Sequence, residues 1–150
     1  MTFRLSAASL AKLEGVDTNL ASVVKRAIQI TLVDFSVIEG LRTVEQQRIL
    51  VAKGASQTMD SNHITGRAVD LMAYVDGRAS WELNLYDDIA LAMKYAATEL
   101  KVKIRWGAAW NVPDLTKWNG TMEGAMNYYI DSKRKVNQRP FIDAPHFELA

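Results

Sequence analysis

Apolar residues recur at helical spacing in two long stretches of the chain. The first follows Asp17 or Thr18, either of which can cap a helix, and its apolar positions are Leu20, Val23, Val24, Ala27, Ile28 and Thr31. The second is expected over residues 81–100, where the shared face holds Leu85, Ile89, Met93, Ala96 and Leu100. Both stripes predict helices that pack in the core.

Shorter patterns predict the remaining elements. A helix over residues 6–14 would begin at Ser6 and stop at Gly15, and Thr43 with Gln46 fits a capping box for a helix over 44–53. Alternating or β-rich stretches predict strands at 33–38, 68–74, 104–106 and 145–149. Residues 108–140 have no clear period beyond a helix expected within 122–134. The fold class is therefore α+β, with helices packed on a small, mostly antiparallel sheet.

The composition is that of one soluble domain over residues 1–150. Hydrophobic residues make up 49% of the chain and charged residues 23%, and a chain of this length buries roughly 68–70% of its unfolded surface. A net charge of +1 gives no reason to expect nucleic acid as a partner. The chain has no cysteine, which excludes disulfides and zinc sites built from thiolates.

The N-terminus shows no signal peptide, since no long apolar stretch follows the basic residue Arg4. No run approaches the ~18 apolar residues of a membrane span, so stable membrane insertion is not expected. We therefore expect the protein to be made and folded in the cytoplasm. A substrate outside the membrane would then require another protein to open a path.

Candidate chemistry gathers around the two histidines of the chain. His63 precedes Asp70 by seven positions, and His146 lies near the C-terminus beside Glu148. Asp70 falls inside an otherwise apolar predicted strand, where an unpaired carboxylate is costly to bury. Asp70 therefore needs a cation, hydrogen-bond donors or a metal.

Two imidazoles and one carboxylate match a catalytic zinc site with an open fourth position. The same three groups also occur in non-haem iron oxygenases, but those place the first histidine and the acid two residues apart on a larger β-sandwich. Spacing alone does not decide between a metal site and two ordinary histidines. By themselves, Arg42 at a strand-to-helix junction and Asp143 before Pro145 would be read as a surface charge and a turn residue.

Two motifs resemble those of a known family. The pattern Ser61-x-His63-x-x-Gly66-x-Ala68-x-Asp70 resembles the signature SxHxxGxAxD of the M15 zinc peptidases, and Asp143-x-x-His146 resembles their second motif. The further stretches that carry the resemblance are 40–43, 105–107 and 145–149. Together they are most similar to the phage endolysins of the L-alanyl-D-glutamate peptidase branch. One departure is Gly107-Ala108-Ala109-Trp110, where relatives often have Gly-Gly-Asp-Trp.

The resemblance implies a Hedgehog/DD-peptidase-like zinc peptidase domain with one catalytic Zn2+. Its ligands would be His63, Asp70 and His146, and Asp143 would serve as general base and then general acid. Arg42 would hold substrate and stabilise the oxyanion, and Ser61 would line the site. The implied reaction is hydrolysis of the L-Ala–D-Glu bond in peptidoglycan stem peptides, which causes bacterial lysis.

The family also suggests how such a protein works in the cell. An endolysin without a signal peptide would wait in the host cytoplasm until a holin opened the membrane toward the wall. We expect a monomer without a separate wall-binding domain. Two alternatives remain at this point: a D-Ala–D-Ala carboxypeptidase of the same zinc family, and a non-catalytic wall-binding or virion structural protein.

Overall fold

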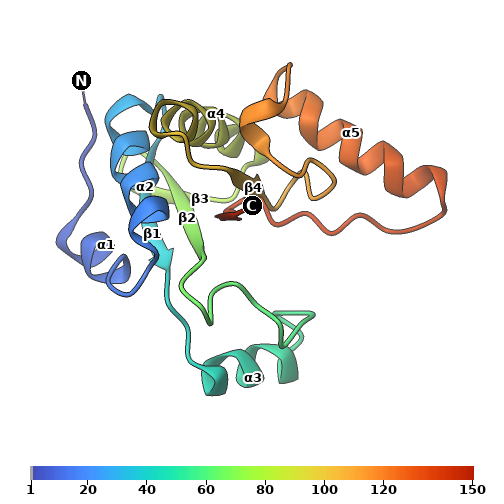
Figure 1. The fold of residues 1–150 in the computed structure, drawn as a ribbon, viewed down its shortest axis with the longest axis horizontal. Helices are drawn as coiled ribbons and strands as arrows, with labels where there is room; N and C mark the ends of the chain where they lie inside the picture. Colours follow the sequence, from blue (N-terminus) through green and yellow to red (C-terminus); the bar gives the residue numbers. More distant parts are fainter. Residues whose placement is uncertain (1) are drawn as a thin grey trace.

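An antiparallel five-stranded sheet lies at the centre of the computed structural model, which describes residues 2–150 (Figure 1). Four strands run in the order β1-β2-β5-β4, and β3 pairs with the end of β2 that β5 does not reach. Their bounds are β1 (Asp34–Glu39), β2 (Ala68–Val75), β3 (Arg78–Ser80), β4 (Ile104–Trp106) and β5 (His146–Leu149). The predicted fold class is confirmed.

Within residues 2–150, five α-helices and one 3-10 helix accompany the sheet. They are α1 (Ala7–Lys12), α2 (Thr18–Ile30), α3 (Val44–Ala52), α4 (Leu83–Leu100), η1 (Leu115–Lys117) and α5 (Met122–Lys135). Ser6 and Asp17 cap α1 and α2, and the capping box of Thr43 and Gln46 is present at α3. Strand β3 was not predicted, because its sequence Arg-Ala-Ser has no β-branched or aromatic residue, unlike the equally short β4.

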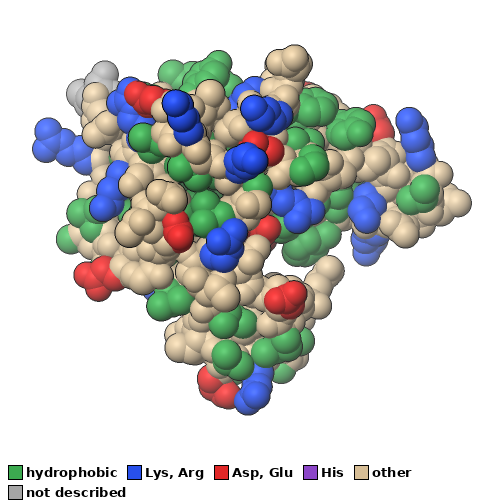
Figure 2. All heavy atoms as spheres, in the orientation of Figure 1, with side chains coloured by type: hydrophobic (Ala, Val, Ile, Leu, Met, Phe, Trp, Pro, Cys, Tyr) green, Lys and Arg blue, Asp and Glu red, His purple; other side chains and the backbone are tan. Residues whose placement is uncertain are grey.

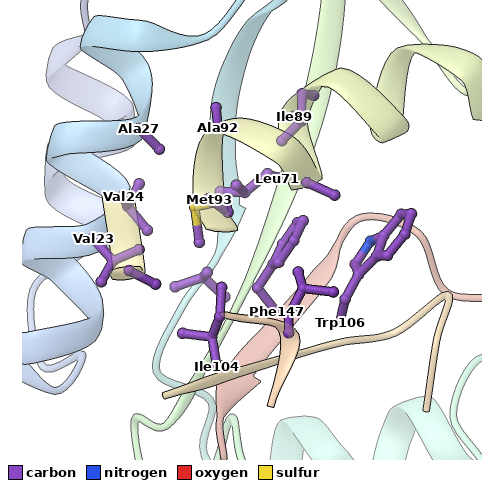
Figure 3. Packing of buried hydrophobic residues seen from close by; sticks show 14 of the residues in the cluster. Val23, Val24, Ala27, Leu71, Ile89, Ala92, Met93, Ile104, Trp106 and Phe147 are labelled. Carbon is purple, nitrogen blue, oxygen red and sulfur yellow. The ribbon is translucent and has the colours of Figure 1, made fainter. Parts of the chain in front are cut away.

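The core lies where α2 and α4 pack against each other and against the sheet (Figure 3). Val24 from α2 and Met93 from α4 meet Leu71 of β2 in this layer, and Phe147 of β5 completes it. Burying each such side chain stabilises the fold by about 1.5–3 kcal/mol. Both predicted apolar faces are therefore confirmed, except that Leu100, in the last turn of α4, is exposed.

Helices α3 and α5 extend away from this layer in different directions (Figure 1). In the view of Figure 1, α3 forms a lobe below the sheet and α5 projects to the right. Gln47 is the only buried residue of α3, so this helix contributes little to the apolar core. Within residues 2–150, no helix is long and apolar enough to cross a membrane.

Candidate metal centre

The sheet register brings two of the predicted ligands face to face. Asp70 of β2 is the register partner of His146 on β5, and on its other side it faces Glu39 at the end of β1. The register between β1 and β2 shifts at Ile38, directly before Glu39. Such irregularities often re-aim side chains beside functional sites. Strand pairing therefore places Asp70 and His146 together although 76 positions separate them.

A tight loop brings His63 to the same place. The Arg42 N–H donates to the His63 carbonyl oxygen at 2.9 Å, which ties this loop to the segment after β1. Gly66 has a φ of +73°, and a Cβ added there would lie 2.4 Å from the Gly15 carbonyl oxygen. Only glycine meets both conditions without strain. The glycine of the first motif is thus required by the backbone that presents His63.

Each imidazole binds protein through one ring nitrogen and turns the other toward Asp70. His63 Nδ1 lies 2.9 Å from the Gly40 carbonyl oxygen, and its Nε2 lies 3.3 Å from Asp70 Oδ1. His146 Nε2 lies 2.7 Å from Glu148 Oε1, and its Nδ1 lies 3.2 Å from Asp70 Oδ1. One ligand atom from each of the three residues lies within 4.8 Å of the other two. This arrangement is typical of a three-ligand metal site in which a hydrogen bond at the other ring nitrogen orients each histidine.

Charge and burial favour a cation at this point. Burial alone would raise the pKa of the Asp70 carboxyl, but hydrogen bonds from His146 and His63 hold that pKa well below its usual range. Burial would lower the pKa of His146, yet hydrogen bonds to Asp70 and Glu148 raise it to about 9. The carboxylates thus favour positive charge beside them. A metal ion would have to displace the proton on His146 Nδ1.

Arg42 is buried beside the three candidate ligands, so reading it as a surface charge would be wrong. Its side chain is 9% exposed, and a terminal nitrogen lies 3.8 Å from Asp70 Oδ2. The other terminal nitrogen donates to Gln47 Oε1 at 2.7 Å. Arg42 Nε is buried without a hydrogen-bond partner among residues 2–150, with Glu39 Oε1 3.8 Å away.

Gln47 connects Arg42 to the loop that lines the pocket. Its side-chain amide donates to Ser56 Oγ at 2.8 Å and to the Thr58 carbonyl oxygen at 2.5 Å. Gln47 is fully buried, and its amide oxygen accepts from Arg42. A single side chain therefore fixes both the guanidinium and the loop.

Replacing Gln47 with alanine should lower the free energy of unfolding by about 1–3 kcal/mol, because the substitution leaves the buried Arg42 guanidinium without this hydrogen-bond partner. Urea denaturation followed by circular dichroism measures the change. Gln46→Ala is the matched control, since it removes the same side chain from the same helix but disrupts only the exposed capping box. Equal losses in the two variants would contradict the role of Gln47.

Asp143 approaches the same point from the segment before β5. Its N–H donates to the Gly107 carbonyl oxygen at 2.9 Å, and a Cβ on Gly107 would lie 2.2 Å from the Asp143 carbonyl oxygen. Asp143 Oδ2 lies 4.0 Å from His146 Nδ1. Burial and then the charge of Asp70 raise the pKa of the Asp143 carboxyl. Its side chain is 37% exposed, so it faces both the three ligands and solvent.

All six predicted site residues line one cavity of about 740 Å³. They are Arg42, Ser61, His63, Asp70, Asp143 and His146. Neither histidine is visible on the face drawn in Figure 2, consistent with their burial. Ser61 Oγ accepts the His63 N–H at 3.2 Å, so Ser61 also shapes the loop. The structure therefore brings these six residues together around one cavity.

Three further pocket residues were missed by sequence reasoning. Glu148 binds His146, while Trp110 and Phe141 stack with ring centroids 6.5 Å apart. The location of Glu148 beside His146 could have been predicted, since residues two apart in a strand share a face. Phe141 had no such signal in the sequence. Trp110 is one of the aromatic residues concentrated in the segment 108–140, for which core packing was the favoured interpretation over a binding groove. Trp118 and Tyr128 pack on each other and do not line this cavity.

Comparisons with known proteins agree on one family. The sequence model of the phage L-alanyl-D-glutamate peptidases matches residues 1–150. The chain is 36% identical to the L-alanyl-D-glutamate peptidase of Escherichia phage T5 over 115 residues, which cover 74% of this chain and 84% of that protein. It is 32% identical to the L-alanyl-D-glutamate peptidase of Listeria phage A118 over 79 residues, 53% of this chain and 27% of that protein.

A solved structure supports the same relationship. The fold is similar to that of the Serratia marcescens L-Ala D-Glu endopeptidase ChiX, with a TM-score of 0.74 and 35% sequence identity. The match covers 99% of this chain and 90% of that one. The similarity therefore includes the segment 108–140, whose pattern was unreadable in the sequence.

Proposed function

Because the chain belongs to the phage L-alanyl-D-glutamate peptidase family, we propose that its pocket hydrolyses the L-Ala–D-Glu bond of peptidoglycan stem peptides with one zinc ion. The observation that carries this proposal is the convergence of His63 Nε2, Asp70 Oδ1 and His146 Nδ1 at the wall of an open cavity. Asp143 and Arg42 line the same cavity, where a substrate carbonyl would lie.

The donor set fits zinc. Two neutral imidazoles and a carboxylate are the ligands of many catalytic zinc sites, and the side facing the cavity leaves room for water and substrate. Both histidines have a second hydrogen bond that orients the ring, as zinc ligands commonly do. When bound, zinc would polarise the scissile carbonyl and make the attacking water more acidic.

We assign the proton transfers of the reaction to Asp143. Its carboxylate lies beside the ligands without belonging to their set, and it is partly open to the cavity. In the proposed reaction Asp143 takes a proton from the attacking water and then gives it to the departing amine of D-glutamate. One carboxylate thus acts first as a base and then as an acid.

We assign the stabilisation of negative charge on the substrate to Arg42. Gln47 and Asp70 hold its two terminal nitrogens, whereas its buried Nε–H lacks a hydrogen-bond partner among the described residues. We assign the Arg42 guanidinium to the substrate carbonyl oxygen, which gains charge as water attacks. Ser61, at the cavity wall, would contact substrate and keep the His63 loop in place.

The cellular setting follows from the same proposal. We propose that the protein is a monomeric endolysin without stable membrane insertion or a nucleic-acid partner. It would reach the wall from the host cytoplasm once a holin had opened the membrane. Its partner there would be the stem peptides of peptidoglycan.

Mass spectrometry of products from purified sacculi tests the proposal. L-Ala–D-Glu hydrolysis should release stem peptides that begin with D-glutamate and leave L-alanine on the glycan. Free D-alanine would instead identify a D-Ala–D-Ala carboxypeptidase, and unchanged sacculi with bound protein would identify a non-catalytic wall-binding protein. Either result would overturn the assigned reaction.

A further inference from the structure

Glu148 contacts His146 at Nε2, the ring nitrogen that does not face Asp70. The two residues are two positions apart in β5 and share a face of the strand. Glu148 is 8% exposed, and its Oε1 lies 2.7 Å from His146 Nε2. Glu148 is not one of the three residues whose ligand atoms converge. Its position is therefore that of a partner to a ligand.

The carboxylate of Glu148 is itself fixed from two other segments. Asn62 Nδ2 donates to Glu148 Oε2 at 2.9 Å, and an Arg105 terminal nitrogen lies 3.9 Å from the same oxygen. Arg105 is held in turn by the Trp110 carbonyl oxygen, which accepts from its Nε at 2.9 Å. Because Asn62 directly precedes His63, the Glu148 carboxylate links the segments that carry both histidine ligands.

We propose that Glu148 is a positioning residue that selects the metal-binding nitrogen of His146. A neutral imidazole carries one N–H, and the hydrogen bond made by one nitrogen decides which nitrogen has a free lone pair. By accepting the Nε2–H, Glu148 leaves Nδ1 free to point at Asp70 and His63. The inference rests on the proposed zinc site and adds how its third ligand is oriented.

The first experiment measures zinc affinity of the purified full chain by competition with a coloured chelator. Glu148→Ala should weaken zinc binding by about 10–100-fold, as loss of such a partner does in other metal sites. Glu148→Gln should recover most of that loss, because its amide oxygen still accepts the Nε2–H. Glu99→Ala is the matched control, since it removes an exposed carboxylate that pairs with Arg26 and does not line the cavity.

The rescue by glutamine separates positioning from a merely structural role. Wild-type affinity in Glu148→Ala, or equal weakening in both variants, would overturn the proposal. If wild-type protein itself bound no zinc, the proposed function would fail as well, whereas normal wild-type binding with an unaffected Glu148→Ala would overturn this inference alone.

Nitrogen NMR of the zinc-loaded wild type gives a test that needs no variant. The chain has only two histidines, so selective ¹⁵N labelling yields a spectrum that is simple to assign. His146 should show a protonated Nε2 and a zinc-bound Nδ1, whereas His63 should show the opposite pattern. Zinc on His146 Nε2 would overturn the proposal even if Glu148→Ala did not fold.

Discussion

Asp143→Asn should lower kcat for L-Ala–D-Glu hydrolysis by about 10²–10⁴ while zinc affinity stays within a few-fold of wild type. The asparagine keeps the size of the side chain and its place beside His146, but it cannot accept the proton of the attacking water. The three converging ligand atoms belong to other residues, so the metal site stays intact. Rates come from release of peptides from purified sacculi, and zinc content from metal analysis.

Asp60→Asn provides the control for this loss. Asp60 also lines the cavity, but it is exposed on the loop after α3 and is not among the residues that converge. We expect the Asp60→Asn variant to hydrolyse sacculi at a rate within a few-fold of the wild type. Near-full activity in Asp143→Asn would remove Asp143 from the mechanism, and loss of zinc from that variant would make its role structural.

The parts of the fold that could be predicted are those with a repeated physical requirement. Burial on one side of α2 and α4 demands an apolar residue on every turn, and that period is visible in a single sequence. The anomaly at Asp70 was also informative, because a carboxylate in an apolar strand must have a partner. The structure gives it His63, His146 and Arg42 as neighbours.

The parts that could not be predicted depend on single contacts across the chain. Gln47 is the one buried residue of α3, so no stripe distinguishes it from its exposed neighbour Gln46. Arg42 looked like a surface charge because its burial depends on Gln47 and on a loop that follows α3. Likewise, the resemblance gave His146 a role but gave none to Glu148, whose Oε1 lies 2.7 Å from His146 Nε2.

The sequence motifs and the backbone geometry give complementary information about this site. Strand register explains why Asp70 meets His146, and the conformation of Gly66 explains how His63 joins them. Neither follows from spacing, since the chain separation of Asp70 and His146 says nothing about pairing. The motifs therefore identify the residues, and the sheet and loop geometry explain why those residues can act together.

Removing zinc should abolish hydrolysis, and adding zinc back should restore it. With the metal absent, Asp143 has no acidified water to deprotonate, and Arg42 alone must stabilise the charge on the carbonyl oxygen. Zinc should also raise the free energy of unfolding, by about 4 kcal/mol when its free concentration is 1,000 times the Kd. The chelated and reloaded protein is assayed on sacculi and by thermal melting.

His63→Ala separates a metal requirement from other effects of the chelator. This variant loses a ligand and the contact to the Gly40 carbonyl oxygen, so added zinc should neither restore its activity nor raise its melting temperature. Gln29→Ala, on α2 and outside the cavity, is the control and should respond to zinc like the wild type. Full hydrolysis by chelated wild type with far less than one zinc per chain would contradict a zinc mechanism. Activity restored in His63→Ala by equimolar zinc would instead contradict this ligand assignment, because two remaining ligands should not hold the ion tightly.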